Sequence, residues 1–170
     1  GHPDIEFVFV GEGPQKARIE SFAEENDLSN FRYLPYFPRE DLKYSLPMAD
    51  VHLMTLREEM AGIAVPGKLY GIMAAGRPVL MVGPAASESG ETIQTSGAGW
   101  VVDPKQKEAP TQALYDALLR LYRGDEKRRR LGQNGRDAFL ETFEREVCCQ
   151  SWAELLRSQV HPSRENTIAA

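Results

Sequence analysis

The sequence predicts an α/β fold in which a parallel sheet is covered by helices on both faces. Short, almost continuously apolar runs alternate along the chain with segments that have helical periodicity. Strands that are buried on both faces have this composition, and they are typical of parallel sheets whose crossovers are helices. The predicted strands are residues 5–10, 31–36, 51–55, 79–82 and 99–102.

A helix is expected after the first strand, because Ile19, Phe22 and Ala23 fall on one helical face. Two further short helices are expected between later strands, over residues 39–44 and 88–95. Pro47 is expected to close the first of them, because proline cannot continue a helical hydrogen-bond ladder.

The last third of the chain is predicted to be helical. Its first helix has an apolar stripe that packs on the sheet, formed by Ala113, Leu114, Ala117, Leu118 and Leu121. Two more helices are expected over residues 125–143 and 144–159. The basic run at 127–130 is interpreted as a solvated helix face, because acidic residues flank it and no aromatic residues interleave.

Composition limits the class of protein. A chain of 170 residues is one domain of ordinary size, and a net charge of -5 argues against non-specific nucleic-acid binding. Cys148 and Cys149 are adjacent and cannot easily pair, so no disulfide framework or metal site is implied. This cysteine usage fits a reducing cytoplasm. No apolar run is long enough to span a membrane. The abrupt start of the first strand suggests a part of a larger protein.

Residues 62–80 carry the most informative pattern. Pro66 and Gly67 precede a helix that Gly76 is expected to end, and a strand comes directly after it. A helix that starts in proline and glycine leaves backbone N–H groups free at its positive end, which suits a phosphate. Lys68 adds a positive charge there. A structural turn without a ligand has the same sequence, so both interpretations stay open.

Two further segments fall at the carboxyl ends of predicted strands, where ligands bind in open α/β sheets. Gly11 and Gly13 would let the backbone approach a ligand closely, or form a tight strand-to-helix turn. Tyr36 and Phe37 lie between prolines and could stack on a planar base, or simply pack.

Several familiar sites are excluded by spacing. A P-loop requires Ser or Thr where residue 69 is Leu, and a dinucleotide fingerprint requires glycine where residue 16 is Lys. His52 lies within a strand and is interpreted as structural. No catalytic residue and no metal-ligating cluster can be named.

Taken in order, these segments resemble the C-terminal, donor-binding domain of retaining GT-B glycosyltransferases, of the glycosyl transferases group 1 or family 4 type. The resemblance runs from about residue 5 to 157, and it is carried by residues 10–14, 31–37, 42–50, 66–70, 75–79 and 97–102. The Pro-x-Lys-Leu-Tyr sequence resembles the subgroup that builds bacterial cell-surface polysaccharide. The resemblance implies a Rossmann-like sheet that forms half of a two-domain enzyme.

The resemblance also implies a division of the chain. Residues 1–143 would be the nucleotide-sugar-binding domain, and residues 144–160 a helix that crosses to a missing N-terminal acceptor domain. Trp152, Leu155 and Leu156 would then be partly exposed in this chain, unless they pack locally. Residues 161–170 would be a flexible tail.

The implied donor site places the base near Tyr36 and Phe37 and the diphosphate near Gly67 and Lys68. Its full set of residues is Gly11, Gly13, Tyr36, Phe37, Ala64, Val65, Pro66, Gly67, Lys68, Leu69 and Gly71. The chain departs from the family pattern in two respects. The basic residues that clamp the diphosphate in the family usually come after the first strand of this domain, upstream of residue 1. The family's Glu-x7-Glu pair, whose second carboxylate binds the ribose, falls here on Ile63 and Gly71. The source of a ribose contact therefore stays open.

The implied activity is transfer of a sugar from a nucleoside diphosphate to a cell-surface polysaccharide or lipid-linked acceptor. No cofactor, metal or nucleic acid is expected, and the part represented by this chain should bind donor weakly and be inactive alone. The full-length protein would be cytoplasmic, and peripheral association with the inner face of a bacterial plasma membrane is compatible with this interpretation. Two alternatives remain, a sugar-nucleotide 2-epimerase and a non-catalytic nucleotide-sugar-binding module, which Gly71 would suit.

Overall fold

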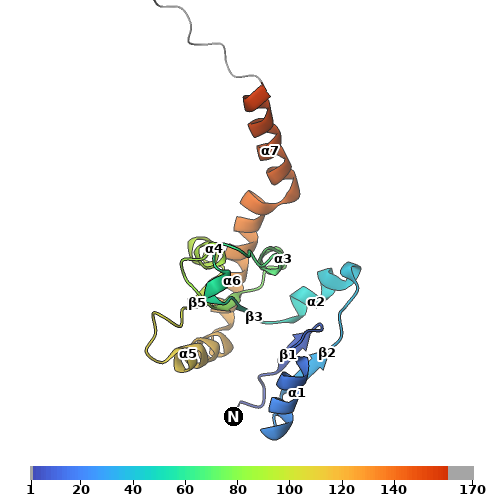
Figure 1. The fold of residues 1–170 in the computed structure, drawn as a ribbon, viewed down its shortest axis with the longest axis vertical. Helices are drawn as coiled ribbons and strands as arrows, with labels where there is room; N and C mark the ends of the chain where they lie inside the picture. Colours follow the sequence, from blue (N-terminus) through green and yellow to red (C-terminus); the bar gives the residue numbers. More distant parts are fainter. Residues whose placement is uncertain (1, 161–170) are drawn as a thin grey trace, which may run out of the picture. The chain divides into compact units, whose positions relative to one another are not determined.

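The computed structural model describes residues 2–160, which form two compact units that divide between Ala49 and Asp50. Each unit contains its own parallel sheet, with two strands in the first and three in the second (Figure 1). All five strands predicted from the apolar runs are present.

The first unit is built on strands β1 (Phe7–Val10) and β2 (Phe31–Leu34), which pair in parallel with Phe7 opposite Phe31. Helix α1 (Lys16–Glu25) connects them. β2 ends two residues earlier than predicted, because Pro35 comes after Leu34 and has no N–H to continue the ladder.

A 3-10 turn η1 (Arg39–Asp41) leads into α2 (Leu42–Met48), which completes the first unit. The prediction that Pro47 closes the helix is wrong, since the helix includes it and ends at Met48. The fixed φ of proline is compatible with a last helical turn, but its missing N–H and the crowding of its ring against the carbonyl four residues earlier let the helix continue by only one residue.

The second unit has strands β3 (His52–Thr55), β4 (Val79–Val82) and β5 (Gly99–Val102), in that spatial order. β4 is central and pairs in parallel on both sides. Its residues Val79, Leu80 and Met81 are fully buried. This burial on both faces explains why the run is apolar at every position.

Four helices surround this sheet: α3 (Lys68–Ala74), α4 (Glu88–Ser96), α5 (Pro110–Arg123) and α6 (Asp125–Ala138). Leu80, Val102, Leu121 and Leu131 form a buried cluster between strands and helices. The predicted apolar stripe of α5 packs against this cluster, so that prediction is confirmed.

The end of α3 confirms the glycine stop. Gly76 has φ +66°, a left-handed conformation that glycine adopts without strain. Its N–H donates to the Met73 carbonyl (2.9 Å), and the Arg77 N–H donates to the Ile72 carbonyl (3.3 Å). These two bonds form a Schellman motif, which satisfies the last carbonyls of the helix.

The predicted single helix over residues 125–143 is wrong in its last turn. α6 ends at Ala138, a π-helical turn η3 covers Phe139–Phe143, and α7 (Arg145–Val160) begins after Glu144. The Glu144 N–H donates to the Phe139 carbonyl across this wider turn (2.9 Å). The turn brings the Phe143 ring onto the Tyr70 ring, with centroids 4.7 Å apart, a contact that the sequence pattern does not reveal.

α7 carries a row of uncovered apolar side chains. Trp152, Leu155 and Leu156 are 64%, 50% and 58% exposed. They do not pack locally within residues 2–160. The prediction of a flexible tail over residues 161–170 lies outside the described residues.

Candidate functional site

The loops that come after β3, β4 and β5 lie at one edge of the second sheet, because parallel strands end at the same edge. The loop after β3 is the longest and contains the 3-10 turn η2 (Glu58–Met60). The Ile63 and Ala64 N–H groups both donate to the Met60 carbonyl, at 3.1 and 3.0 Å. Beyond this turn the Ile63 and Val65 side chains are exposed, the first by 78%.

Backbone donors are unoccupied where this loop enters α3. Within residues 2–160, nothing accepts a hydrogen bond from the N–H of Gly67 or of Lys68. The next N–H, that of Leu69, is already bonded to the Pro66 carbonyl (3.0 Å). The space where a Gly67 side chain would lie is open to at least 4 Å. Two adjacent N–H groups with open space in front of them can bind an anion.

Lys68 adds a positive charge beside these donors. In the described part of the chain its ammonium group has no ion-pair or hydrogen-bond partner. The residue is exposed, yet the protein atoms around the ammonium lower its pKa through desolvation. A lone and partly desolvated cation favours an anionic partner.

Leu69 has a different position from its neighbours. Its side chain is fully buried with those of Ile72 and Met73. Leu69 therefore anchors the loop in the core rather than facing a ligand. The other predicted site residues just before it keep some exposed surface, namely Ala64, Val65, Pro66, Gly67 and Lys68.

The loop after β4 is fixed by two contacts that sequence reasoning missed. Gly83 has φ +158°, and a β-carbon there would lie 2.5 Å from the Leu56 carbonyl oxygen, so this loop lies tightly against the loop after β3. The Asp103 carboxylate accepts hydrogen bonds from the N–H groups of Ala85 and Lys105, both at 2.9 Å. These bonds lower the Asp103 pKa. The Asp-Pro sequence at the end of β5 is the signal that indicates such a turn.

α3 is also tied to the start of α4. The Tyr70 hydroxyl donates to the Glu88 carboxylate (3.3 Å), and Glu88 is the first residue of α4. Desolvation, together with the smaller effect of the nearby Glu88 charge, raises the Tyr70 pKa. Sequence reasoning could not find this pair, because the two residues are 18 positions apart and belong to different helices.

In the first unit, the parallel register brings Gly11 and Tyr36 together beyond the ends of β1 and β2. Gly11 has φ +128°, and a β-carbon there would lie 2.9 Å from the Tyr36 ring. The Tyr36 hydroxyl donates to the Glu12 carbonyl at 3.3 Å, although the residue is 69% exposed. Phe37 is half-buried, and the space around Gly13 is open.

Neither a metal cluster nor a membrane-spanning helix is found among the described residues. Residues 2–160 contain no group of three or more histidine, cysteine, aspartate or glutamate side chains placed to hold a metal ion. None of the helices in that range combines the length and the apolar character that a membrane-spanning helix requires.

Parallel strands flanked by helices, with open backbone donors at the strand ends, define a Rossmann-like α/β protein. The chain belongs to the glycosyl transferases group 1 family, whose model matches residues 1–138. Membership of this family favours a transferase over the epimerase alternative.

Two curated relatives come from bacteria. The chain is 33% identical over 115 residues to WbjE of Pseudomonas aeruginosa, which is named a probable glycosyltransferase. It is 32% identical over 114 residues to WcaI of Escherichia coli (strain K12), which is named as a colanic acid biosynthesis glycosyl transferase. These alignments cover 68% and 66% of this chain. The aligned part spans only 28% of the length of each relative.

Solved structures of glycosyltransferases share the fold. Sucrose-phosphate synthase from Thermosynechococcus elongatus matches with a TM-score of 0.71 over 92% of this chain and 39% of that one. WaaG, described as a glycosyltransferase involved in lipopolysaccharide biosynthesis, matches with a TM-score of 0.63 over 79% of this chain and 33% of that one. Both are 23% identical in sequence, so they show the GT-B fold alone.

Proposed function

We propose that this chain is the part of a group 1 glycosyltransferase that binds a nucleoside-diphosphate-sugar donor. The observation that carries the proposal is the unoccupied pair of N–H groups at Gly67 and Lys68, next to an ammonium group with no partner in the described part of the chain. These groups lie at the carboxyl edge of the sheet, where ligands of open α/β sheets bind.

The chemistry of such a site is electrostatic. When a sugar leaves a nucleoside diphosphate, negative charge develops on the departing diphosphate, and fixed donors that face it stabilise the transition state. The Gly67 N–H, the Lys68 N–H and the Lys68 ammonium would supply that stabilisation. The proposal assigns the positive charge to the protein, so donor binding should not require a divalent cation.

The base and ribose contacts stay predictions. Tyr36 offers an exposed ring face next to the Gly11 turn, a geometry that supports stacking on a base. Position 71 has no side chain to bind a ribose, so we expect the ribose hydroxyls to contribute less to affinity than a carboxylate contact would provide.

The proposed acceptor is a growing bacterial cell-surface polysaccharide or a lipid-linked precursor, handled in the cytoplasm at the inner face of the plasma membrane. The names of WcaI and WaaG support this class of product. Sugar transfer would need the remaining part of the protein, because the chain spans 28% of its curated relatives. The exposed row on α7 supports a contact with that part. The chain alone should bind donor without transferring sugar.

The test is calorimetry of the chain against UDP, GDP and dTDP and their sugars, with and without EDTA. Lys68→Ala should weaken binding of the preferred nucleotide about tenfold, because one charge contact with a phosphate is lost. Lys127→Ala is the matched control, since it removes the same charge outside the carboxyl-edge loops. Equal affinity of the Lys68→Ala variant and the unmodified chain would discard the phosphate role. Tight binding without transfer by the full-length protein would favour the non-catalytic module.

A further inference from the structure

The loop that leads from η2 into α3 has an apolar tip, a name used here for residues 60–67. No side chain in this segment is polar. Ile63 is 78% exposed and Val65 is 42% exposed, although both are large aliphatic residues. Two aliphatic side chains therefore face solvent in the segment just before the candidate phosphate donors.

Several backbone donors of the apolar tip are already used within the loop. The N–H groups of Ile63 and Ala64 both donate to the Met60 carbonyl, at 3.1 and 3.0 Å. The N–H of Ala61 donates to the Glu58 carbonyl (3.0 Å). A hydroxyl group placed against the Ile63 side chain would therefore find no polar side chain of the tip and no free N–H on Ile63 itself.

The apolar tip is held at both of its ends. Before it, Glu58 in η2 forms an ion pair with Lys105, which comes after β5, with 3.0 Å between the two charged atoms. After it, the Leu69 side chain is fully buried in the core. A loop with two anchored ends presents its side chains at a lower entropic cost of binding than a free loop would.

The apolar tip is close to the groups that would bind the diphosphate. Two residues of chain span at most about 7 Å, so the α-carbon of Val65 lies no farther than that from the α-carbon of Gly67. The corresponding limit for Ile63 is about 14 Å. In a nucleoside-diphosphate sugar the hexose is joined directly to the second phosphate. A diphosphate bound at Gly67 and Lys68 can therefore bring its sugar against the tip.

We infer, on the basis of the proposed donor-binding function, that the donor sugar carries a methyl group that contacts the Ile63 and Val65 side chains. A methyl group is present at C6 of a 6-deoxyhexose and in the acetamido group of an N-acetylhexosamine. Burial of a methyl group against aliphatic side chains favours binding. A hydroxyl group in the same place would lose its water without gaining a partner, which lowers affinity.

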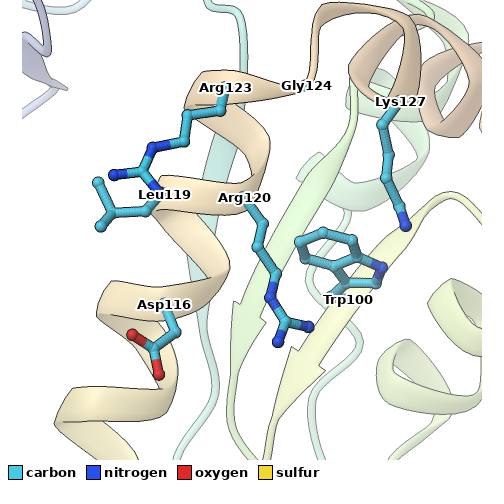
Figure 2. A pocket seen from close by; sticks show the side chains of 7 residues that line it. All are labelled: Trp100, Asp116, Leu119, Arg120, Arg123, Gly124 and Lys127. Atoms are coloured by element: carbon cyan, nitrogen blue, oxygen red, sulfur yellow. The ribbon is translucent and has the colours of Figure 1, made fainter.

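The second unit also has a hollow of about 500 Å³ where β5, α5 and α6 meet. Figure 2 shows Arg120 and Lys127 beside the Trp100 indole in this hollow. The Lys127 ammonium lies 5.2 Å from the centre of the indole ring, and Asp116 adds a negative charge to the lining. The hollow shares no residue with the apolar tip, so substitutions distinguish the two places.

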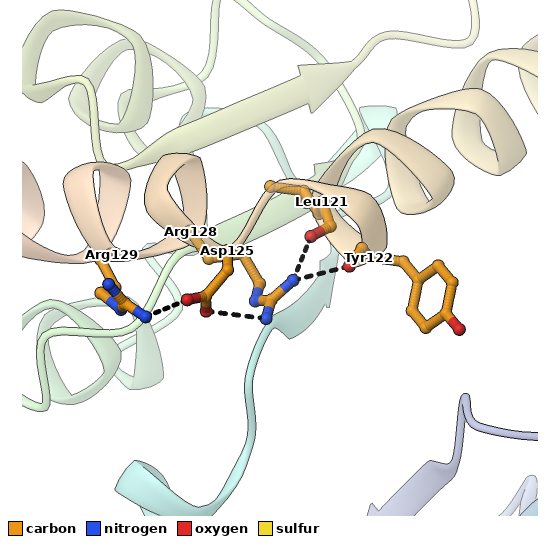
Figure 3. Close-up of polar contacts among 5 residues, drawn as sticks. All are labelled: Leu121, Tyr122, Asp125, Arg128 and Arg129. Atoms are coloured by element: carbon orange, nitrogen blue, oxygen red, sulfur yellow. Dashed lines mark hydrogen bonds and ion pairs between the residues drawn. The ribbon is translucent and has the colours of Figure 1, made fainter.

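Lys127 is a better residue than Arg128 for testing the hollow. The Arg128 guanidinium donates to the Leu121 and Tyr122 carbonyls, at 2.5 and 2.8 Å (Figure 3). It also pairs with Asp125 at 3.0 Å. Loss of Arg128 would disturb the junction of α5 and α6, whereas Lys127→Ala removes a charge without breaking these bonds.

The experiment is calorimetry of the chain with donors that share a nucleotide and differ in one group. The nucleotide is whichever of UDP, GDP and dTDP binds, and its sugars are glucose, 6-deoxyglucose and N-acetylglucosamine, followed by the three corresponding galactose forms. In at least one series a methyl-bearing sugar should bind at least about fivefold more tightly than the parent hexose. The form that binds more tightly identifies the source of the methyl group. Equal affinities throughout both series would overturn the inference.

Two variants test the contact itself. Ile63→Gln supplies an amide that can pair with a hydroxyl group, so the preference for the methyl-bearing sugar should disappear. Val65→Thr replaces one methyl group by a hydroxyl in a side chain of the same shape, and should reduce the preference. Leu156→Gln is the matched control, because it changes another exposed aliphatic residue, on α7, and should keep the preference. An unchanged preference in both loop variants would overturn the inference.

Nucleotides without a sugar separate this inference from the proposed function. If a bare nucleoside diphosphate binds but the methyl group has no effect, the donor site stands and the inference is wrong. If no nucleotide binds, the donor site itself is wrong and the inference falls with it.

Two other outcomes would give the apolar tip a different role. If Lys127→Ala weakens binding of the sugar donors and Ile63→Gln does not, the sugar lies in the hollow and the inference is wrong. If Ile63→Gln lowers only the binding of the chain to phosphatidylglycerol vesicles, the tip contacts lipid and the inference is also wrong.

Discussion

The Tyr70 hydroxyl donates a hydrogen bond to the Glu88 carboxylate, while its ring lies on Phe143. One side chain of α3 thus contacts the start of α4 and the π-helical turn that precedes α7. The helix that begins at the candidate donor loop is therefore held at its outer face as well as in the core. Substitutions of Tyr70 or its partners should therefore change the stability of α3, and with it the stability of the loop that leads into α3.

Removal of the Tyr70 hydroxyl should have a small effect on stability that depends on pH. Tyr70→Phe keeps the ring contact and loses one partly exposed hydrogen bond, so the free energy of unfolding should fall by about 0.5–1 kcal/mol at neutral pH. The folded-state pKa of Tyr70 is raised, so its stabilising contribution is complete below the unfolded pKa of about 10 and is lost as pH rises through the folded value. Urea unfolding from pH 8 to 11 should show the difference between the two proteins shrinking. If the difference in unfolding free energy stayed constant from pH 8 to 11, the Tyr70 hydroxyl would not be the group responsible.

Asp103→Asn should destabilise the second unit at neutral pH, and this effect should disappear as the pH falls. The pKa of Asp103 is lowered in the folded state by the Ala85 and Lys105 N–H groups. Its contribution is therefore present above the unfolded pKa of about 4 and is lost as pH falls through the folded value. Thermal melts should separate the two proteins at pH 7 and bring them together in strong acid. Superimposable melts at pH 7 would show that the loop contact contributes nothing.

Gly83→Ala should be strongly unfavourable. The added β-carbon would meet the Leu56 carbonyl oxygen at 2.5 Å in a backbone conformation that side chains rarely adopt. Strain of this kind costs about 1–3 kcal/mol. Gly13→Ala is the matched control, because its β-carbon would meet nothing within 4 Å, and its free energy of unfolding should be nearly unchanged. Equal stability of the two variants would contradict the tight contact between the loops after β3 and β4.

Leu69→Ala should lower stability by about 2–5 kcal/mol, because a fully buried leucine leaves a cavity. Ile63→Ala changes a side chain that is 78% exposed and should alter the free energy of unfolding by less than about 0.5 kcal/mol. Chemical denaturation measures both. An Ile63 variant as unstable as the Leu69 variant would show that the loop packs elsewhere.

The sequence pattern predicts much of the fold because each strand is a local apolar run with clear boundaries. The end of α3 at Gly76 is equally local, since one glycine conformation determines it. The prediction for Pro47 is wrong by one residue, because the φ of proline is compatible with a last helical turn. The prediction for residues 139–143 is wrong because a π-helical turn replaces the α-helix where Phe143 packs on Tyr70.

For the candidate site, sequence identifies the loop but not the direction of every side chain. Leu69 faces the core because of the residue at which α3 begins, and helix starts are poorly determined by sequence. The Tyr70–Glu88 and Asp103–Ala85 bonds join segments that are 18 residues apart, so no short motif indicates them.

The residues of α3 that stabilise the fold are different from the residues of the loop that could contact a ligand. Leu69, Ile72 and Met73 lie in the core, whereas Ile63 and Val65 stand in solvent on the loop before them. Under the proposed donor-binding function, substitutions on that loop would change the surface offered to the sugar while the core is left intact. A selection experiment could therefore diversify residues 63–65 at little risk to folding, and it would measure whether they influence the choice of donor.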